Sequence, residues 1–305
     1  CGDGYKIFRT WSVLNWCIGS SFDHVQTILV TDNLGPEITQ SNIVIGTNEE
    51  DCTANVTLND LLVTDACSAV TDISVSYLDD ENLVIANLSN GEALNNLPFG
   101  ENTVTITATD ECLNTTSEEV IITVIDDVIP TAICNDGLNI SLSDEGVGLL
   151  SAIELDEGSN DNCSEVSVLI RSLGCEGEAF AETAAFACCD VGIVRVELLV
   201  TDAAGNTNIC WADLLVEDAS TPMVTCADDM TIDCNEDLHV EDLFTAPTVS
   251  DNCSTVISES EIVEVELPNC GQLLRKTYTV SDGSIKSDDA TCQQTITVLH
   301  VSDFI

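Results

Sequence analysis

The stretch "GIVRVELLVTDAAGNTNICWADLLVEDASTP", residues 192–222, decides the fold. Apolar residues occupy every second position on both sides of its Gly-Asn turn. The apolar set is Val194, Val196, Leu198 and Val200 before the turn, and Cys210, Ala212, Leu214 and Val216 after it. Alternation with a period of two on either side of a tight turn predicts an antiparallel hairpin with one buried face.

The end of this hairpin recurs along the chain. A proline closes "VTDNLGP", "VIDDVIP" and "VEDASTP" at positions 36, 130 and 222, which are 94 and 92 residues apart. A second marker runs in phase with the first: "TDACS", "NDNCS" and "SDNCS" surround cysteines 67, 163 and 253. Two independent markers with one shared period indicate tandem repeats of a single module.

The repeat predicts the domain organisation of an all-β protein. Module 1 spans residues 35–129, module 2 spans 130–221 and module 3 spans 222–305. Alternating strands with frequent turn signals favour an antiparallel β-sandwich for each module. No segment has a convincing helical period; the stretch 180–189 comes closest, and we expect one helical turn or a loop there.

The charge balance excludes several classes of partner. The 305 residues include 54 acidic and 7 basic side chains, a formal net charge of −47. Phosphate backbones and anionic lipids repel such a chain, so we expect no nucleic-acid binding. No apolar run reaches about 18 residues, so we expect no membrane insertion either.

Sixteen cysteines point to disulfides. The chain has no C-x-x-C motif and three histidines, at positions 24, 239 and 300, so zinc sites are not favoured. Aromatic residues make up 4% of the chain, which leaves the cores to Val, Ile, Leu and Ala. Paired cysteines in an oxidising, extracellular setting fit this composition.

The motifs "VTDAAGNTNIC", "SDNCS" and "VEDASTP", followed by "MVTCADDMTIDC", resemble those of hyalin-repeat (HYR-like) and related bacterial immunoglobulin-like modules. Such modules lie in tandem along large secreted surface proteins, notably of Bacteroidetes-type bacteria. The resemblance implies immunoglobulin-like sandwiches, cell-surface export, a role in adhesion or fibre building, and no catalytic residues. Module 1 departs from the pattern, because no cysteine closely follows its proline and none follows "TSEEV".

Residues 1–34 parallel the end of module 3. Both segments run from Cys-Gly through a strand and a variable loop to "QTI-V". We therefore expect residues 1–34 to be the last strands of an incomplete module. Its front half either lies upstream in a longer polypeptide, or these strands complete a neighbouring chain by strand addition.

The alternation also predicts disulfide partners. Cys134 with Cys210 and Cys226 with Cys292 would tie the first strand of modules 2 and 3 to the last, because these cysteines fall on inward faces. We expect Cys163 to pair with Cys188 or Cys189, Cys175 to take the other, and Cys253 to pair with Cys270.

Modules 1 and 3 each hold an odd number of cysteines, three and five. A leftover thiol in an exported chain is either free or bonded outside its own module. A link between modules or subunits is one of these two outcomes.

Carboxylates precede each of the three prolines that mark the boundaries between modules. Calcium takes 6–8 oxygen ligands and would stiffen such a joint. The candidate ligands are Asp32, Asp126, Asp127, Glu217 and Asp218, and the turn residues Asp65, Asp161 and Asp251 could contribute. The alternative is that these carboxylates are solvated surface charge.

The chain contains none of the common catalytic or nucleotide-binding motifs, so we expect it not to be an enzyme. The expected function is a structural part of an extracellular fibre, filament or adhesin stalk that associates with its own kind or with further modules, and surface glycans or proteins are other candidate partners. The alternative is a set of carbohydrate-binding or accessory modules of a secreted enzyme. Exposed tryptophans would favour it, but we expect Trp11 to pack in a core.

Overall fold

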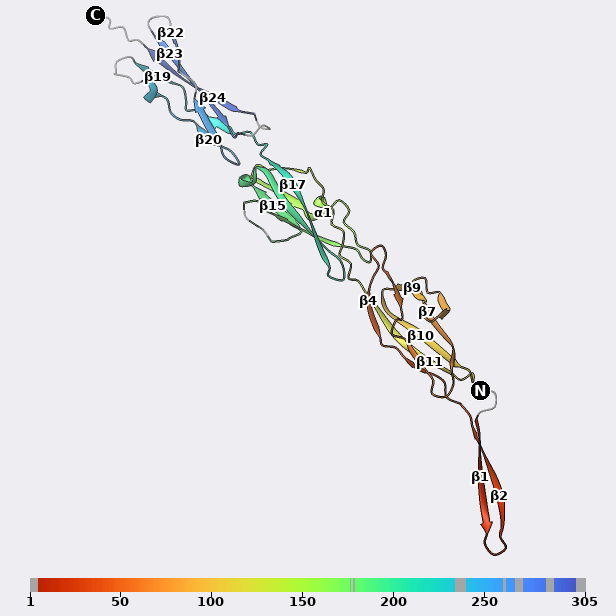
Figure 1. The fold of residues 1–305 in the computed structure, drawn as a ribbon. Coiled ribbons are helices and arrows are strands. Elements are labelled where there is room, and N and C mark those ends of the chain that lie inside the picture. Colours follow the sequence, from red (N-terminus) through yellow and green to blue (C-terminus); the bar gives the residue numbers. More distant parts are fainter. Residues whose placement is uncertain are drawn as a thin grey trace, which may run out of the picture. The chain divides into compact units, whose positions relative to one another are not determined.

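In the computed structural model, the protein divides into two compact units. Unit 1 comprises residues 1–129 and 161–164, and unit 2 comprises residues 130–160 and 165–305. The structure describes residues 5–175, 177, 179–233, 240–259, 262–266, 271–283 and 288–299. Both units consist mainly of β-strands, as Figure 1 shows. The expected all-β fold of tandem sandwiches is confirmed.

Unit 1 begins with a hairpin of two long strands, followed by the strands of module 1. The elements are β1 (Tyr5–Asn15), β2 (Ser20–Val30), β3 (Glu37–Thr39), β4 (Ile43–Gly46), β5 (Thr53–Thr57), β6 (Leu62–Thr64), β7 (Val70–Leu78), β8 (Val84–Ser89), β9 (Ala93–Pro98), β10 (Gly100–Asp110) and β11 (Thr115–Ile125).

Module 1 is a sandwich built around a five-stranded sheet in the order β4-β11-β10-β7-β8, with the strand pairs β3–β6 and β5–β9 beside it. Its core joins Ile106 and Ile122 of the large sheet to Ala54, Leu94 and Leu97 of the β5–β9 pair. The apolar residues of β10 fall at every second position, which is why one face of this strand is buried throughout.

Unit 2 holds module 3 and all of module 2 except residues 161–164, which belong to unit 1. Module 2 contains β12 (Asn139–Ser141), β13 (Val147–Ser151), α1 (Ala152–Leu155), β14 (Ser167–Ser172), β15 (Thr183–Ala187), the 3₁₀ turn Cys188–Asp190, β16 (Gly192–Thr201) and β17 (Thr207–Glu217). Module 3 contains β18 (Met223–Thr225), β19 (Met230–Asp233), the 3₁₀ turn Val240–Leu243, β20 (Thr248–Ser250), β21 (Val256–Glu259), β22 (Val263–Glu266), β23 (Gln272–Ser281) and β24 (Ala290–Leu299).

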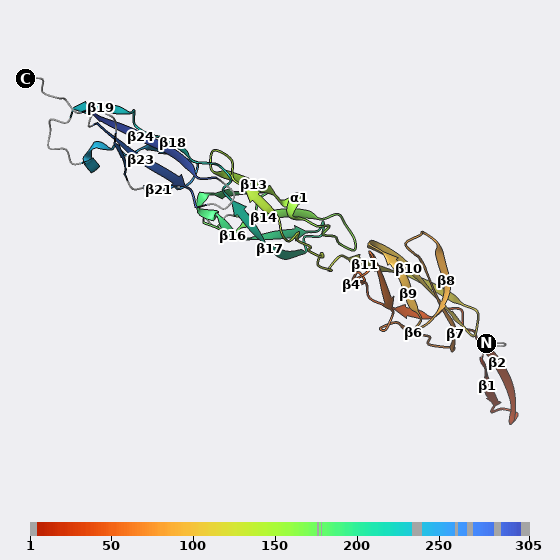
Figure 2. The same ribbon diagram turned by 90° about the horizontal axis from the view of Figure 1, so that it is seen from above.

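The hairpin predicted within residues 192–222 is β16–β17, and it lies in the middle of the sheet β12-β17-β16-β14. Figure 2 shows its two strands with β14. Its inward residues are buried as predicted, from Val194 to Val216. On the outward face, Arg195 donates to Asp213 of the paired strand at 2.8 Å and lies over the ring of Trp211. The periodicity therefore assigned both faces correctly.

The strand pairing is not purely antiparallel. In each module one short strand pairs in parallel with the last strand: β4 with β11, β12 with β17 and β19 with β24. Modules 1 and 3 also have a shorter strand just after their prolines, β3 and β18, which pairs antiparallel with β6 and β20. The segment that follows each of these prolines therefore contributes first to one sheet and then to the other.

Two local expectations were wrong. The stretch 180–189 is neither a helical turn nor a loop in its main part, because β15 runs through Thr183–Ala187 with Ala184 and Phe186 buried. The short helix α1 was not expected. Ser151 and Glu154 form a capping box at its start, and the pattern S-x-x-E that signals such a box is visible in the sequence.

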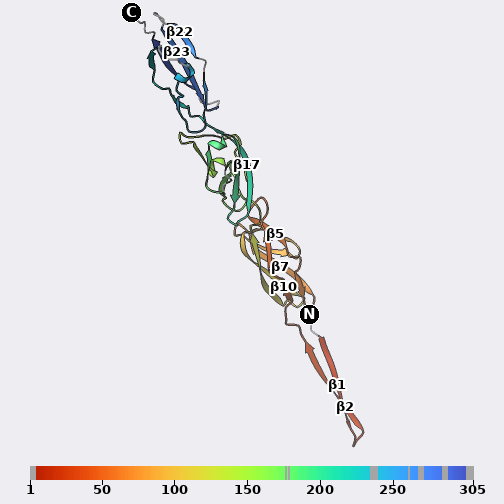
Figure 3. The same ribbon diagram turned by 90° about the vertical axis from the view of Figure 1, so that its left-hand side faces the viewer.

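The hairpin β1–β2 forms a sheet of two strands, and Figure 3 shows the two strands running side by side. Its apolar side chains are exposed on both faces, including Ile7, Phe8 and Trp11. The expectation that Trp11 packs in a core is wrong, because no strand among the described residues covers this hairpin.

The two faces of β17 differ in what they contribute to stability. Leu214 is fully buried, and truncation to alanine should lower the free energy of unfolding by about 2–5 kcal/mol, through lost burial and the cavity left behind. Leu215 is the adjacent, outward residue, so Leu215→Ala should cost less than about 1 kcal/mol. Denaturant unfolding followed by Trp211 fluorescence measures both, and equal losses would contradict this assignment of faces.

Candidate metal sites at the acidic joints

Five disulfides lie among the described residues: Cys52–Cys163, Cys134–Cys210, Cys175–Cys189, Cys188–Cys253 and Cys226–Cys292. The first-to-last bridges Cys134–Cys210 and Cys226–Cys292 are those that the alternation predicted. Cys112 is also disulfide-bonded, and Cys17 and Cys67 are free.

The pairing predicted for the D-N-C-S cysteines was wrong. Cys163 bonds Cys52 rather than Cys188 or Cys189. Cys175 bonds Cys189, which is one of the two partners expected for it. Cys253 bonds Cys188, and Cys270 lies outside the described residues. The bonded cysteines are adjacent in space but 111 and 65 residues apart in sequence, so no local pattern reveals them.

Each D-N-C-S turn is shaped by its aspartate. Asp161 accepts hydrogen bonds from the backbone N–H groups of Cys163 and Ser164, at 2.9 and 3.2 Å. Asp251 accepts from Cys253 in the same way. Asp and Asn favour such turns because their short side chains can bond to nearby backbone.

The asparagine of each turn binds a backbone carbonyl far away in sequence. Asn162 donates through Nδ2 to the carbonyls of Asn48 and Asp51 at 2.8 and 3.1 Å, all within unit 1. Asn252 donates to the carbonyl of Ser143 and to Asp218 Oδ1, both at 3.0 Å, within unit 2. The turn with its disulfide and its asparagine bonds is called the latch below.

Three carboxylates meet beside the latch of unit 2. One oxygen each of Asp218, Asp251 and Asp282 lies within 4.8 Å of the others, and Asp218 is 4% exposed. Three like charges at such spacing repel one another and gain from a bound cation.

Two side-chain oxygens beside this cluster are further evidence for a cation site. Oδ1 of Asp251 and Oδ1 of Asn252 are fully buried, and neither has a hydrogen-bond partner. A buried polar oxygen without a partner is costly, and a metal ion would satisfy it. Carboxylate and amide oxygens are the ligands that calcium prefers, so these residues fit a calcium ion.

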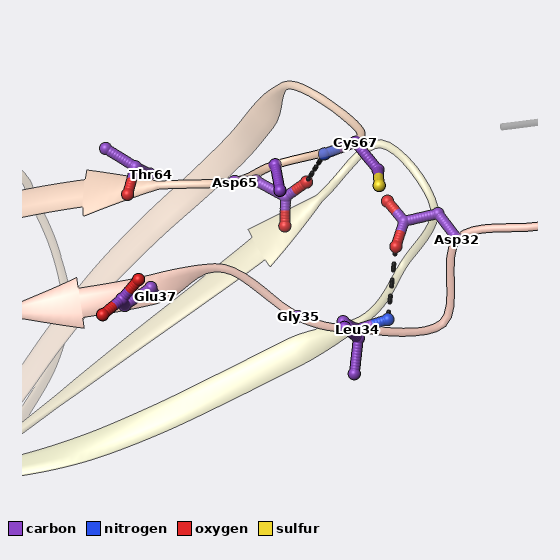
Figure 4. A pocket seen from close by; sticks show the side chains of 8 residues that line it. Asp32, Leu34, Gly35, Glu37, Thr64, Asp65 and Cys67 are labelled. Carbon is purple, nitrogen blue, oxygen red and sulfur yellow. Dashed lines mark hydrogen bonds between the residues drawn. The ribbon is translucent and has the colours of Figure 1, made fainter.

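A second group of carboxylates lies in unit 1, where module 1 follows β2. Carboxylate oxygens of Asp32 and the buried Asp110 lie within 4.8 Å of each other. The hydroxyl of Ser68 lies within hydrogen-bonding distance of both Asp65 and Asp110, at 3.2 and 3.0 Å, and its one hydrogen is donated to either carboxylate. Cys112 also lies in this group, but a disulfide sulfur is not a thiolate ligand. Asp32 and Asp65 line a pocket of about 290 Å³ together with Cys67, which Figure 4 shows.

The protein itself satisfies Asp110. Its carboxylate accepts from the backbone of Cys112 and from Asn114, at 2.7 to 2.9 Å. Burial raises the pKa of Asp110, but bonds from Asn114, Ser68 and Cys112 together hold it below its usual value. Backbone bonds from Ser68 and Cys67 likewise lower the pKa of Asp65. A cation is therefore needed less here than in unit 2.

The predicted ligands are only partly brought together. Asp32 and Asp218 join the clusters just described, and carboxylate oxygens of Asp126 and Asp161 lie within 4.8 Å of each other in unit 1. Among the described residues, Asp127 and Glu217 belong to no such cluster.

Sequence reasoning missed Asp110 and Asp282. Each follows a Thr or Ser at the end of the penultimate strand of its module, as Asp202 does in module 2. That recurrence was a usable signal. The group Cys175, Cys189 and Asp190 is no metal site, because its two sulfurs are bonded to each other.

No family model matches the chain, and no curated protein matches it. Solved structures are similar at low identity. Protocadherin Gamma B7 extracellular cadherin domains 1–4 are 14% identical, with a TM-score of 0.41 over 96% of this chain and 83% of that one. Human CDH23 EC21–23 is 13% identical, with a TM-score of 0.34 over 87% and 99%.

The fibronectin(III)-like modules of Clostridium thermocellum CbhA are 11% identical, with a TM-score of 0.24 over 60% of this chain and 95% of that chain. No described helix is long and apolar enough to cross a membrane.

The pKa shifts of unit 1 predict acid sensitivity. Because the folded pKa values of Asp65 and Asp110 are lowered, their contribution to stability is complete above the ordinary value of about 4 and is lost as the pH falls through the lower folded values. The urea concentration at which half of unit 1 is unfolded should therefore decrease when the pH is lowered below about 4.

Asp110→Asn should flatten this pH dependence, because asparagine does not titrate. Asp60→Asn, at an exposed position of the same module, should leave it unchanged. Urea unfolding between about pH 2 and pH 7 measures it, and a wild-type slope in Asp110→Asn would contradict the assignment.

Proposed function

We propose that the protein is a structural part of an extracellular fibre, filament or adhesin stalk. Tandem sandwiches with disulfides inside and between modules support this role, because crosslinks resist both unfolding and bending. Disulfides persist in oxidising compartments, which supports an extracellular location. The proposal assigns no catalytic step to any residue.

The latch is the observation that carries the proposal. In unit 2 the bond Cys188–Cys253 joins module 2 to module 3, and Asn252 adds hydrogen bonds to Ser143 and Asp218 of module 2. The backbone already joins the two modules, so this disulfide is a second covalent link that restricts their motion relative to each other. Such a restraint suits a chain under tension, because it keeps neighbouring modules from bending or twisting freely.

We further propose that calcium binds at Asp218, Asp251 and Asp282. The ion would neutralise three clustered charges, and the oxygens of Asp251 and Asn252 that lack a hydrogen-bond partner would be among its ligands. Asp218 belongs to module 2 and the other ligands belong to module 3, so the ion would reinforce the latch.

Electron microscopy of the native material tests the structural role. The expected result is regular filaments or stalks with an axial repeat of one module or a multiple of it. Dispersed monomers under the same conditions would count against the proposal.

A glycan-binding accessory role is the second candidate, because Trp16 and Trp211 are both exposed. Arg195 lies 4.1 Å from the ring centre of Trp211, however, so one face of that ring is already occupied. Calorimetric titration with soluble oligosaccharides tests this role, and heat that disappears in Trp211→Ala would support it.

The latch predicts restricted motion within unit 2. Replacing Cys188 and Cys253 together by serine should broaden the distribution of angles between modules 2 and 3, measured by small-angle scattering or single-particle images. Replacing Cys134 and Cys210 is the matched control: it should destabilise module 2 by about 2–4 kcal/mol without broadening that distribution. Identical distributions in both variants would contradict the latch.

Calcium should stabilise module 3 through Asp251. At a free concentration about 100 times Kd, a bound ion adds about 2.7 kcal/mol to the folded state, which raises Tm by several degrees. Asp251→Asn should remove most of this gain, whereas Asp288→Asn, which removes the same charge from an exposed position, should keep it.

Calorimetric scans with calcium and with a chelator measure the effect of the ion. A Tm that does not change on chelation would contradict the site.

A further inference from the structure

Buried side-chain oxygens without a hydrogen-bond partner are concentrated in two turns. Among the described residues there are five such oxygens. One belongs to Gln40, and the other four are Oδ1 of the aspartate and Oδ1 of the asparagine in each D-N-C-S turn, at positions 161–162 and 251–252. A buried oxygen that accepts no bond is costly, so the same exception in two copies of one turn indicates a shared ligand.

In unit 1 the other polar atoms of these two side chains are already occupied. Oδ2 of Asp161 accepts from the backbone N–H of Cys163 at 2.9 Å. Nδ2 of Asn162 donates to the carbonyls of Asn48 and Asp51 at 2.8 and 3.1 Å. These bonds fix both side chains, and one oxygen of each is left without a partner.

A second carboxylate from unit 1 meets this turn just after β11. Oxygens of Asp126 and Asp161 lie within 4.8 Å of each other, so their charges repel unless a cation binds. Asp126 occupies the position that Asp218 has in unit 2, because each lies four residues before a module-boundary proline. Each also accepts from the backbone N–H two residues later, at 3.3 and 3.1 Å.

The adjacent Asp127 is held elsewhere. Its carboxylate lies against Gly46 of β4, so closely that a side chain at position 46 would collide with it. Of the two neighbouring carboxylates that the sequence offered as ligands, Asp126 is therefore the one that the fold brings to the turn.

The turn "TDACS" shows what happens without the asparagine. It has Ala66 where the other two turns have asparagine, so it offers no amide oxygen. Oδ1 of Asp65 accepts from the backbone of Cys67 and Ser68 at 2.9 and 2.7 Å. Neither Asp65 nor the nearby Asp110 has a buried oxygen without a partner. Clustered carboxylates alone therefore do not produce the unpartnered oxygens.

We propose that calcium also binds in unit 1, with Asp126, Asp161 and Oδ1 of Asn162 among its ligands, and that the residue after the aspartate of each D-x-C-S turn decides which turns bind an ion. An amide oxygen adds a ligand without adding negative charge, which suits calcium beside two carboxylates. The inference rests on the calcium site proposed for unit 2 and extends it by a rule: asparagine permits binding and alanine does not.

Amide hydrogen exchange of the full chain, followed during calcium titration, tests the site. Calcium should slow exchange at residues 126–128 and 161–164. Asp161→Asn keeps an oxygen that can accept the backbone bonds of the turn but places an NH₂ group where the unpartnered oxygen lies. It should raise the apparent Kd for calcium at these residues by at least about tenfold.

Glu165→Gln is the matched control, because it removes the same charge from an exposed position four residues later. It should keep the wild-type Kd. Equal Kd values for Asp161→Asn and the wild-type chain, or no calcium-dependent protection of residues 161–164, would overturn the proposal.

Two substitutions of Asn162 separate a ligand from a structural hydrogen-bond donor. Asn162→Ala and Asn162→Asp both lose the bonds donated to Asn48 and Asp51, but only aspartate keeps an oxygen for the ion. Calcium should therefore still protect residues 161–164 in Asn162→Asp and should not protect them in Asn162→Ala. The same result in both variants would overturn the role assigned to the asparagine oxygen.

The turn with alanine gives the converse test. Calcium should leave exchange at residues 65–68 of the wild-type chain unchanged, and Asp32→Asn should not alter calcium binding at residues 161–164. Calcium-dependent protection of residues 65–68 would contradict the rule that asparagine decides.

The turn of unit 2 separates this inference from the calcium site proposed above. Protection of residues 251–254 that Asp251→Asn abolishes, with none at residues 161–164, would overturn only the site in unit 1. No calcium-dependent protection at either turn would remove both sites. The structural role would still stand, because electron microscopy tests it independently of calcium.

Discussion

Every module depends on covering one face of its closing hairpin. In β16–β17 that face consists of valine, leucine and alanine together with the disulfide-bonded Cys210, and it is covered because a second sheet packs over it. Aromatic residues make up 4% of the chain, so most of the core is aliphatic. A sheet of alternating strands cannot bury its apolar face by itself, and for this reason each module contains two packed sheets.

The disulfides offset the destabilising effect of the large net negative charge. A formal net charge of −47 on 305 residues opposes compaction, and few cations are present to pair with it. The bridges Cys134–Cys210 and Cys226–Cys292 hold first and last strands together within a module, and Cys188–Cys253 holds two modules together. The acid groups beside the latch are the points at which bound cations would relieve the same repulsion.

The repeated sequence specifies both the module and its connection to the preceding module. The D-N-C-S turn lies within a module in sequence, yet its asparagine and cysteine bind residues that precede that module, as Asn252 and Cys253 show in unit 2. A single repeated element thereby specifies both the fold and its connection to the next copy. Cys67, the cysteine of the first D-x-C-S turn, is free, and the hairpin β1–β2 pairs with no other described strand.

The sequence by itself determined what depends on local periodicity. The faces of β16 and β17 and the two first-to-last bridges follow from alternation, because successive side chains of a strand point to opposite sides. The repeat of about 92 residues follows from the spacing of the proline and D-x-C-S motifs. Only the tertiary structure decided the partners of Cys163 and Cys253, the parallel strands β4, β12 and β19, and the meeting of Asp218 with Asp282. These contacts join residues about 60 or more apart in sequence, and only the packing of complete sandwiches brings them together.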